Sequence, residues 1–294
     1  MSSTTPALFR GLLDDAAVFP PAALALPDAV AAHRVHRHSA YAGCVGPLLV
    51  PASSVAELVS LLLGDARPPG AAVGEPLDVV LVSRPGSEPS VLAAGLHVLT
   101  DQAATRVVGV ELGWEDGWRE LGLDDVAVAL EVPRGPEQAI AAADIRAAVS
   151  EGRPVVAKFR TGPTPTWEWP DSAELAAFIR LVTGHGVPFK LTGGLHHAVR
   201  GTYAVAGSPE ENHGVLNVLL ATAAGLEGAE AEELAAVLEV SDGGALADLV
   251  AAWTPTTAAA VRRAFTSYGC CTVTDPIGEL ADLGLLPHPD EGPR

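Results

Sequence analysis

Two lysines carry the strongest chemical signal in this sequence. Lys158 and Lys190 are its only lysines, and the other sixteen of its 18 basic residues are arginines. Both lie in apolar runs typical of strands instead of on polar helix faces. A buried amine can lose its proton and attack a carbonyl carbon, which a guanidinium cannot do. The pair therefore predicts a reactive amine, with a lysine imine as the leading chemistry.

Strand alternation gives the lysines polar neighbours. Successive side chains on a strand point to opposite faces, so Lys158 shares a face with Arg160, and Lys190 shares a face with Thr192. These residues lie toward the C-terminal ends of their predicted strands, where (β/α) barrels build active sites. We expect Lys158 to form the imine and Lys190 to perturb its pKa.

Two glutamates are expected on the same inner face. Glu111 shares its side of the strand with Val107 and Gly109, and Glu131 shares its side with two alanines, while bulkier residues occupy the opposite faces. If the small side is the barrel lumen, Glu111 or Glu131 can move protons in the reaction. The alternative is that these charges and the lysines form a buried ion-pair network with no chemistry.

A glycine turn follows each lysine, in Lys158-Phe-Arg-Thr-Gly162 and in Lys190-Leu-Thr-Gly-Gly-Leu-His-His197. Backbone N–H groups in such turns can approach an anion, which suggests a phosphate- or carboxylate-bearing substrate. Adjacent residues of an extended chain point apart, so one histidine should face the site, and we favour His196 as a catalytic group. The predicted substrate-binding residues are Arg160, Thr161, Gly162, Thr192, Gly193, Gly194 and His197.

Two other functions use the same residues. A divalent cation such as Mg, Mn or Zn could be held by Glu111, Glu131, His196 and His213, with the lysines as acid and base. No HxH or HExxH spacing supports such a site. A non-catalytic protein could also capture an acidic metabolite with these cations. The leading hypothesis, a lyase or aldolase-like enzyme, needs no cofactor.

The N-terminal segment and one loop could complete the site. Asp14 and Asp15 precede a Pro pair that fixes an extended turn, and either could reach the site, although capping or solvent exposure is favoured. Trp167 and Trp169 lie in the Pro-rich loop after the first lysine strand and could cover a substrate. The basic cluster His33–His38 is expected to decorate the exposed end of the first helix.

Composition narrows the class of protein. A formal net charge of −18 with no basic stripe argues against nucleic acid as a partner. No apolar run approaches the roughly 18 to 20 residues of a membrane span, and the first residues lack a secretory signal. The three cysteines have no CxxC spacing. We expect a cytoplasmic protein that binds a small anionic metabolite, without a membrane partner, and that can form a homo-oligomer.

Strand-like and helix-like patterns alternate along the chain, which is typical of βαβ units around a parallel sheet. Helices are expected at 53–63, 136–150 and 172–183, the first and third capped by a serine. Seven strands are visible, one fewer than a closed barrel needs, and 213–226 could add a strand followed by a helix or be a single helix. The predicted strands are 44–50, 77–82, 106–112, 126–132, 154–160, 187–192 and 269–274.

These elements favour a single (β/α)8-type (TIM-like) barrel with helical C-terminal decoration. An open doubly wound sheet is the alternative, but no GxGxxG or Walker sequence supports it. Residues 1–42 would form an N-terminal closing segment and helix, and 227–266 a mostly helical insertion. The tail, 287–294, should be frayed.

Two resemblances follow from these motifs. The set Gly11–Pro21, Val50–Ser53, Lys158–Gly162, Phe189–His197 and His213–Asn217 resembles a family of uncharacterised bacterial barrel-like proteins, which implies no reaction. The two lysine motifs alone are similar to class I aldolases of the deoxyribose-phosphate type. That likeness implies a Schiff base on one lysine and a second lysine that lowers its pKa. It departs in strand number, because Lys158 lies on the fifth predicted strand and the aldolases use their sixth.

Overall fold

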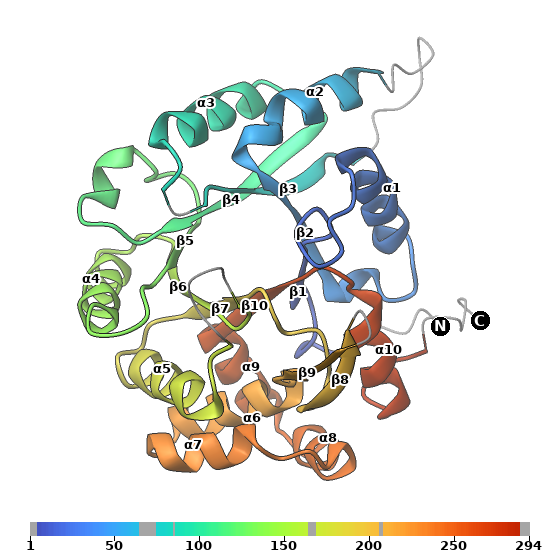
Figure 1. Ribbon diagram of the computed structural model, residues 1–294, viewed down its shortest axis with the longest axis vertical. Coiled ribbons are helices and arrows are strands. Elements are labelled where there is room, and N and C mark those ends of the chain that lie inside the picture. Colours follow the sequence, from blue (N-terminus) through green and yellow to red (C-terminus); the bar gives the residue numbers. More distant parts are fainter. Residues whose placement is uncertain (1–4, 65–74, 85, 164–168, 206–207, 289–294) are drawn as a thin grey trace.

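A closed barrel of eight parallel strands forms the centre of the protein (Figure 1). The computed structural model describes residues 5–64, 75–84, 86–163, 169–205 and 208–288. The barrel strands are β1 (Leu13–Asp15), β2 (Val45–Pro51), β3 (Leu77–Val82), β4 (Thr105–Gly113), β5 (Val128–Glu131), β6 (Val155–Arg160), β7 (Phe189–Thr192) and β10 (Phe265–Cys270). Because β1 pairs with both β2 and β10, the sheet has no open edge. The predicted (β/α)8 barrel is confirmed, and the open doubly wound sheet is wrong.

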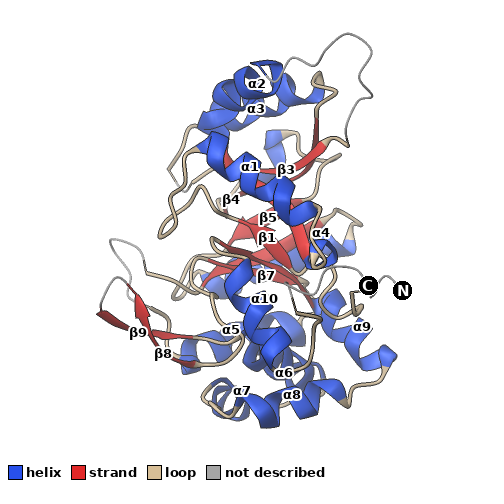
Figure 2. Ribbon diagram, turned by 90° about the vertical axis from the view of Figure 1, so that its right-hand side faces the viewer, coloured by secondary structure: helices blue, strands red, loops and turns tan. Residues whose placement is uncertain are grey.

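Helices surround the barrel, and a small hairpin stands beside it (Figure 2). Those on the outside are α1 (Leu26–Arg37), α2 (Val55–Gly64), α3 (Pro89–Thr100), α4 (Gln138–Ser150), α5 (Ser172–Gly184), α6 (Val215–Leu226), α7 (Ala231–Leu238), α8 (Gly243–Ala251), α9 (Pro255–Ala264) and α10 (Thr274–Asp282). The antiparallel hairpin consists of β8 (Gly201–Val205) and β9 (Ser208–Asn212). None of the described helices is long and apolar enough to cross a membrane.

The eighth strand comes from the N-terminus, not from 213–226, which contains the single helix α6. In β1, Leu13 pairs with Tyr268 on one side and with Val45 on the other. Three residues are too few to show a period of two, so alternation could not reveal this strand. With β1 counted, Lys158 lies on the sixth strand of the barrel and Lys190 on the seventh.

The last strand and the N-cap of α5 differ from expectation. The last strand begins at Phe265, directly after α9, and ends at Cys270, so the range 269–274 is wrong by four residues at each end. Its polar Ser267 obscured the apolar pattern. The first turn of α5 is capped by Asp171, whose carboxylate accepts the backbone N–H of Glu174 at 2.8 Å, whereas Ser172 lies within the helix.

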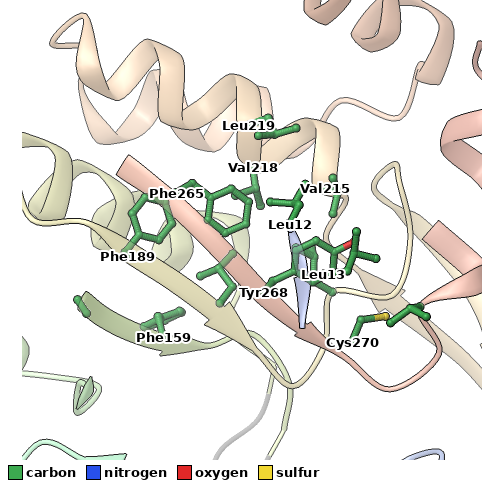
Figure 3. Close-up of a cluster of buried hydrophobic side chains, with 14 of the residues drawn as sticks. Leu12, Leu13, Phe159, Phe189, Val215, Val218, Leu219, Phe265, Tyr268 and Cys270 are labelled. Atoms are coloured by element: carbon green, nitrogen blue, oxygen red, sulfur yellow. The ribbon is translucent and has the colours of Figure 1, made fainter. Parts of the chain in front are cut away.

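Aromatic side chains on the outer surface of the barrel pack against the helices (Figure 3). Phe189 of β7 and Phe265 of β10 stack with ring centroids 5.2 Å apart, and Phe159 of β6 stacks on Phe178 of α5 at 4.6 Å. All four side chains are fully buried. Because Phe159 and Phe189 point outward, the neighbouring Lys158 and Lys190 must point into the barrel.

Candidate active site

Six ionic side chains form a continuous alternating chain inside the barrel. Lys190 Nζ donates to Asp14 Oδ2 at 2.6 Å and also to Glu111. Lys158 Nζ donates to Glu111 Oε2 at 2.9 Å and lies 2.9 Å from Glu131 Oε2. This charge chain comprises, in order of contact, Asp14, Lys190, Glu111, Lys158, Glu131 and Arg160.

Strand register brings these residues together. Glu131 on β5 lies opposite Lys158 on β6, which in turn lies opposite Lys190 on β7. Arg160, two residues beyond Lys158, donates from Nε to Glu131 Oε1 at 2.9 Å. Glu131, Lys158 and Arg160 lie in the C-terminal halves of their strands, the end at which barrel enzymes carry their chemistry, whereas Lys190 is the second residue of β7.

Only one of the two N-terminal aspartates enters the lumen. Asp14 also accepts the hydroxyl of Ser267 at 2.8 Å, whereas Asp15 points outward and binds His33 Nδ1 at 2.9 Å. The expected solvent exposure of these aspartates is wrong, because both are buried, whereas Asp15 does cap a turn, since its Oδ1 accepts the backbone N–H of Ala17 at 3.1 Å. His33 is buried too, so the basic cluster is not wholly a solvated helix end.

A register shift in β4 changes the expected neighbours of Glu111. Between β3 and β4 the pairing slips by one residue after Val107, because Val79 faces Val107 and Val80 faces Gly109. Val107 therefore packs against the outer core, and Val108 packs against the cluster inside the barrel. The predicted shared face of Glu111 and Val107 is wrong, since a bulge interrupts the period of two.

Because the charge chain is buried, each of its charges needs a partner of opposite sign. The side chains of Glu111 and Lys158 are each 2 % exposed, and buried ions are tolerated only when they are paired. Burial alone would raise the pKa of Glu111, but the ammonium groups of Lys158 and Lys190 hold it at about 2. Likewise, Lys158 and Arg160 overcome the effect of burial and hold the pKa of Glu131 at about 2. Three cations thus neutralise three carboxylates.

Lys190 is held as an ammonium ion. Burial lowers its pKa, but the carboxylates of Asp14 and Glu111 together raise the pKa of Lys190 above its ordinary value. Its side chain is 6 % exposed. The amine next to Lys158 on the adjacent strand is therefore a fixed positive charge.

A cavity of about 890 Å³ opens at the C-terminal end of the barrel. Lys158, Glu111, Glu131, Arg160 and Thr192 line it. Among the described residues, Asp14 and Lys190 do not, so they form the inner part of the charge chain and Lys158 is the lysine that borders the cavity. The four central residues expected from sequence are thus brought together, but the two lysines differ in access.

The two adjacent histidines point to different environments. His196 lines the cavity, where its Nδ1 lies 3.5 Å from Cys271 Sγ, and burial lowers its pKa. His197 instead donates from Nδ1 to Glu279 at 2.7 Å and stacks on Tyr203 with ring centroids 3.3 Å apart. The structure therefore places His197 outside the cavity wall, and the expected substrate contact is wrong for this residue.

The glycine turns serve close packing of two loops. A Cβ built on Gly162 would lie 1.4 Å from the carbonyl oxygen of Gly193, and one on Gly194 would lie 2.6 Å from the carbonyl oxygen of Thr161. Only glycine permits such contact between backbones. Gly193, with φ +80°, is the turn residue that lines the cavity, beside Arg160. Gly162 and Gly194 therefore have a packing role, and neither lines the cavity; their anion-binding role stays a prediction.

The remaining predicted residues lie at the margin of the site. Thr161 is fully buried and its hydroxyl donates to the carbonyl of Thr192 at 3.2 Å, so it braces the loop without lining the cavity. Trp169 lines the cavity, as a covering residue would. Trp167 lies outside the described residues, as does most of the predicted tail, 289–294.

The alternative metal ligands are not gathered. His213 Nε2 donates to the carbonyl of Pro170 at 2.9 Å, and Glu111 and Glu131 are engaged by the lysines. Within the described parts of the chain, no group of three or more His, Cys, Asp or Glu side chains is placed to hold a metal ion.

Sequence reasoning missed several residues of the site. Ser267 supports Asp14, Cys271 contacts His196, and Arg84 and Arg134 line the cavity. Their position in the sequence was an available signal, because Cys271, Arg84 and Arg134 each follow a barrel strand within three residues.

Comparison with known proteins found no matching family model, curated protein or solved structure. The family grouping and the aldolase likeness therefore remain predictions.

Proposed function

We propose that this protein is a lyase of the aldolase type that acts on an anionic carbonyl substrate through an imine on Lys158. The observation that carries the proposal is the unequal lysine pair: one amine lines the cavity, and the other, opposite it on the next strand, is covered and ionised. A fixed cation beside an amine disfavours its protonated form, which is how some enzymes activate a lysine nucleophile. The positions on the sixth and seventh strands also remove the departure from the aldolases in strand number.

Loss of the Lys158 proton has a defined route. Glu131 accepts Arg160 Nε on Oε1 at 2.9 Å and Arg160 Nη2 on Oε2 at 3.3 Å, and the same Oε2 lies 2.9 Å from Lys158 Nζ. An anionic substrate that engages Arg160 would weaken its hold on Glu131 and raise the pKa of that carboxyl. Glu131 can then take the proton from Lys158, leaving a neutral amine and a neutral acid.

The chemical steps balance without a cofactor. The amine nitrogen adds to the carbonyl carbon, and water leaves with a proton returned by Glu131, forming a protonated imine. For cleavage, a base takes the proton of the β-hydroxyl group, and the bond between the α and β carbons breaks to release a carbonyl product. The electron pair of that bond forms the double bond of an enamine, and the C=N π pair returns to nitrogen. Return of the proton to the α carbon and hydrolysis of the imine by water release the second product and free Lys158. His196, on the cavity wall with a lowered pKa, is available as that base.

Borohydride trapping tests this function directly. Wild type is incubated with a panel of oxo-acids and sugar phosphates, reduced, and measured by intact mass and peptide mapping. Lys158 and Lys190 are the only lysines of the chain, so peptide mapping distinguishes them, and we expect a single adduct on the peptide that contains Lys158. Lys158→Met should abolish it, and Arg106→Lys, an amine placed on the exposed surface, measures non-specific trapping. The assignment is wrong if Lys158→Met labels as strongly as wild type.

A second function is favoured by the same contacts. Lys158 lies within 2.9 Å of two carboxylates whose pKa values are held at about 2, which is the setting of an ammonium ion. As an ammonium ion it could donate to a carbonyl oxygen and stabilise an enolate, as in an isomerase. Carbonyl ligands that protect the protein from unfolding but leave no adduct after reduction would favour this reading.

A further inference from the structure

The cavity is much larger than a small oxo-acid requires. At about 890 Å³ it lies toward the upper end of the range for ligand sites and corresponds to the liquid volume of about 30 water molecules. The charge chain lies at its inner end, where Lys158 is almost fully buried. A ligand that reacts at Lys158 therefore leaves most of the cavity available for another part of the same molecule.

Two arginines line this remaining space. Arg84 follows β3 and Arg134 follows β5, in a chain whose net charge is −18. Arg134 is oriented by Glu174 of α5, which accepts both Nε and Nη2. The guanidinium of Arg84 lies 5.7 Å from the centroid of the Phe19 ring. Two carboxylates, Glu115 and Glu210, also line the cavity.

Aromatic rings accompany these arginines. Phe19, Trp114 and Trp169 line the cavity. Trp114 donates its indole N–H to Asp144 on α4 at 3.0 Å, so its polar atom is already satisfied and the ring offers an apolar surface. Guanidinium groups bind carboxylate and phosphate oxygens through paired hydrogen bonds and stack on planar groups.

We propose that Arg84 and Arg134, with Phe19 and Trp114, form a second subsite that binds a planar group bearing a phosphate or carboxylate. The substrate is then a bipartite carbonyl compound, with its reacting carbon at Lys158 and its anionic ring at this arginine subsite. The reactive end of this assignment rests on the proposed function, whereas the subsite itself does not.

Binding of phenyl phosphate tests the subsite without any imine. It carries a planar ring and a phosphate but no carbonyl, and phenol and inorganic phosphate are the matched controls. By calorimetry we expect phenyl phosphate to bind wild type and Lys158→Met equally, at least about tenfold more tightly than either control. Arg84→Gln and Arg134→Gln should each weaken it about tenfold, and Arg106→Gln, on the exposed face of β4, should not. Arg134→Gln also removes the contact of Arg134 with Glu174. Arg84 is exposed, so Arg84→Gln tests the subsite independently of that contact.

Imine trapping at Lys158 tests the reactive site and the arginine subsite together. Pyridoxal 5′-phosphate should label Lys158 at lower concentration than pyridoxal. Arg84→Gln should remove that advantage, whereas Arg106→Gln should leave labelling by both aldehydes unchanged. If phenyl phosphate binds as expected but no aldehyde labels Lys158, the imine function fails and the subsite stands. If phenyl phosphate binds no better than phenol and phosphate, or is insensitive to both arginine substitutions, the subsite is overturned.

Discussion

Replacement of Lys190 by methionine should destabilise the fold strongly and in a way that a second substitution repairs. Lys190 is 4 % exposed and joins Asp14 to Glu111. Without Lys190, the only side-chain hydrogen bond to Asp14 from the described residues is the one donated by the Ser267 hydroxyl. Removing one partner of a buried ion pair costs about 3–5 kcal/mol, because a charge stays buried without compensation.

The same cost can be expressed as a melting shift. An unfolding entropy of about 2.1 cal/mol/K per residue over 294 residues gives about 0.6 kcal/mol/K, so Tm should fall by about 5–8 °C. Urea unfolding followed by tryptophan fluorescence gives the free energy of unfolding directly. Arg106→Met, which breaks the exposed pair with Asp78, serves as control and should leave the free energy of unfolding close to that of wild type.

The double variant Asp14→Asn with Lys190→Met decides the mechanism. Neutralising Asp14 removes the uncompensated charge, so the double variant should recover at least half of the lost free energy, with a coupling of about 0.5–3 kcal/mol. The reasoning is refuted if Lys190→Met lies within about 1 kcal/mol of wild type. It is also refuted if the two substitutions add without coupling.

Three further predictions concern acid stability, loop packing and amine reactivity. Glu111 has a pKa of about 2 in the folded protein against an ordinary 4.5, so the stability that its ionised form contributes is present above about pH 4.5 and is lost as pH falls toward 2. Urea midpoints measured from pH 2 to 7 should fall over that range, and Glu111→Gln should reduce this pH dependence. Gly162→Ala should lower the free energy of unfolding. Gly278→Ala in α10, whose built Cβ meets no atom within 4 Å, should raise it by about 0.5–1 kcal/mol, and equal effects in urea unfolding would contradict the packing role. Lys190→Met should lower the yield of the reduced adduct on Lys158, because Lys190 no longer holds Glu111 in place beside Lys158, and an unchanged yield would exclude that role.

Local pattern predicted most of the barrel. The runs around Lys158 and Lys190 alternate over four to six residues, which is long enough for a period of two to identify the inward side. It failed where the period is interrupted or too short. The bulge in β4 moves Val107 to the outer face, and the three residues of β1 show no pattern. Both features depend on pairing with distant strands, which no local window contains.

Part of the candidate site is likewise predictable from local sequence, and part depends on contacts between distant segments. That Lys158 and Lys190 enter the lumen with Glu111, Glu131 and Arg160 follows from alternation along each strand. That Asp14 enters with them depends on β1 closing the barrel against β10, 250 residues away along the chain. A shift of one residue would have exchanged it for Asp15.

The sequence by itself determined that two scarce amines lie on inward positions of late strands, because residue type and alternation are local properties. The tertiary structure decided which amine borders the cavity. Lys190 is enclosed by Asp14 and Glu111, and Lys158 borders the cavity. That difference arises from barrel closure and strand register, which are set by contacts between segments far apart in the chain.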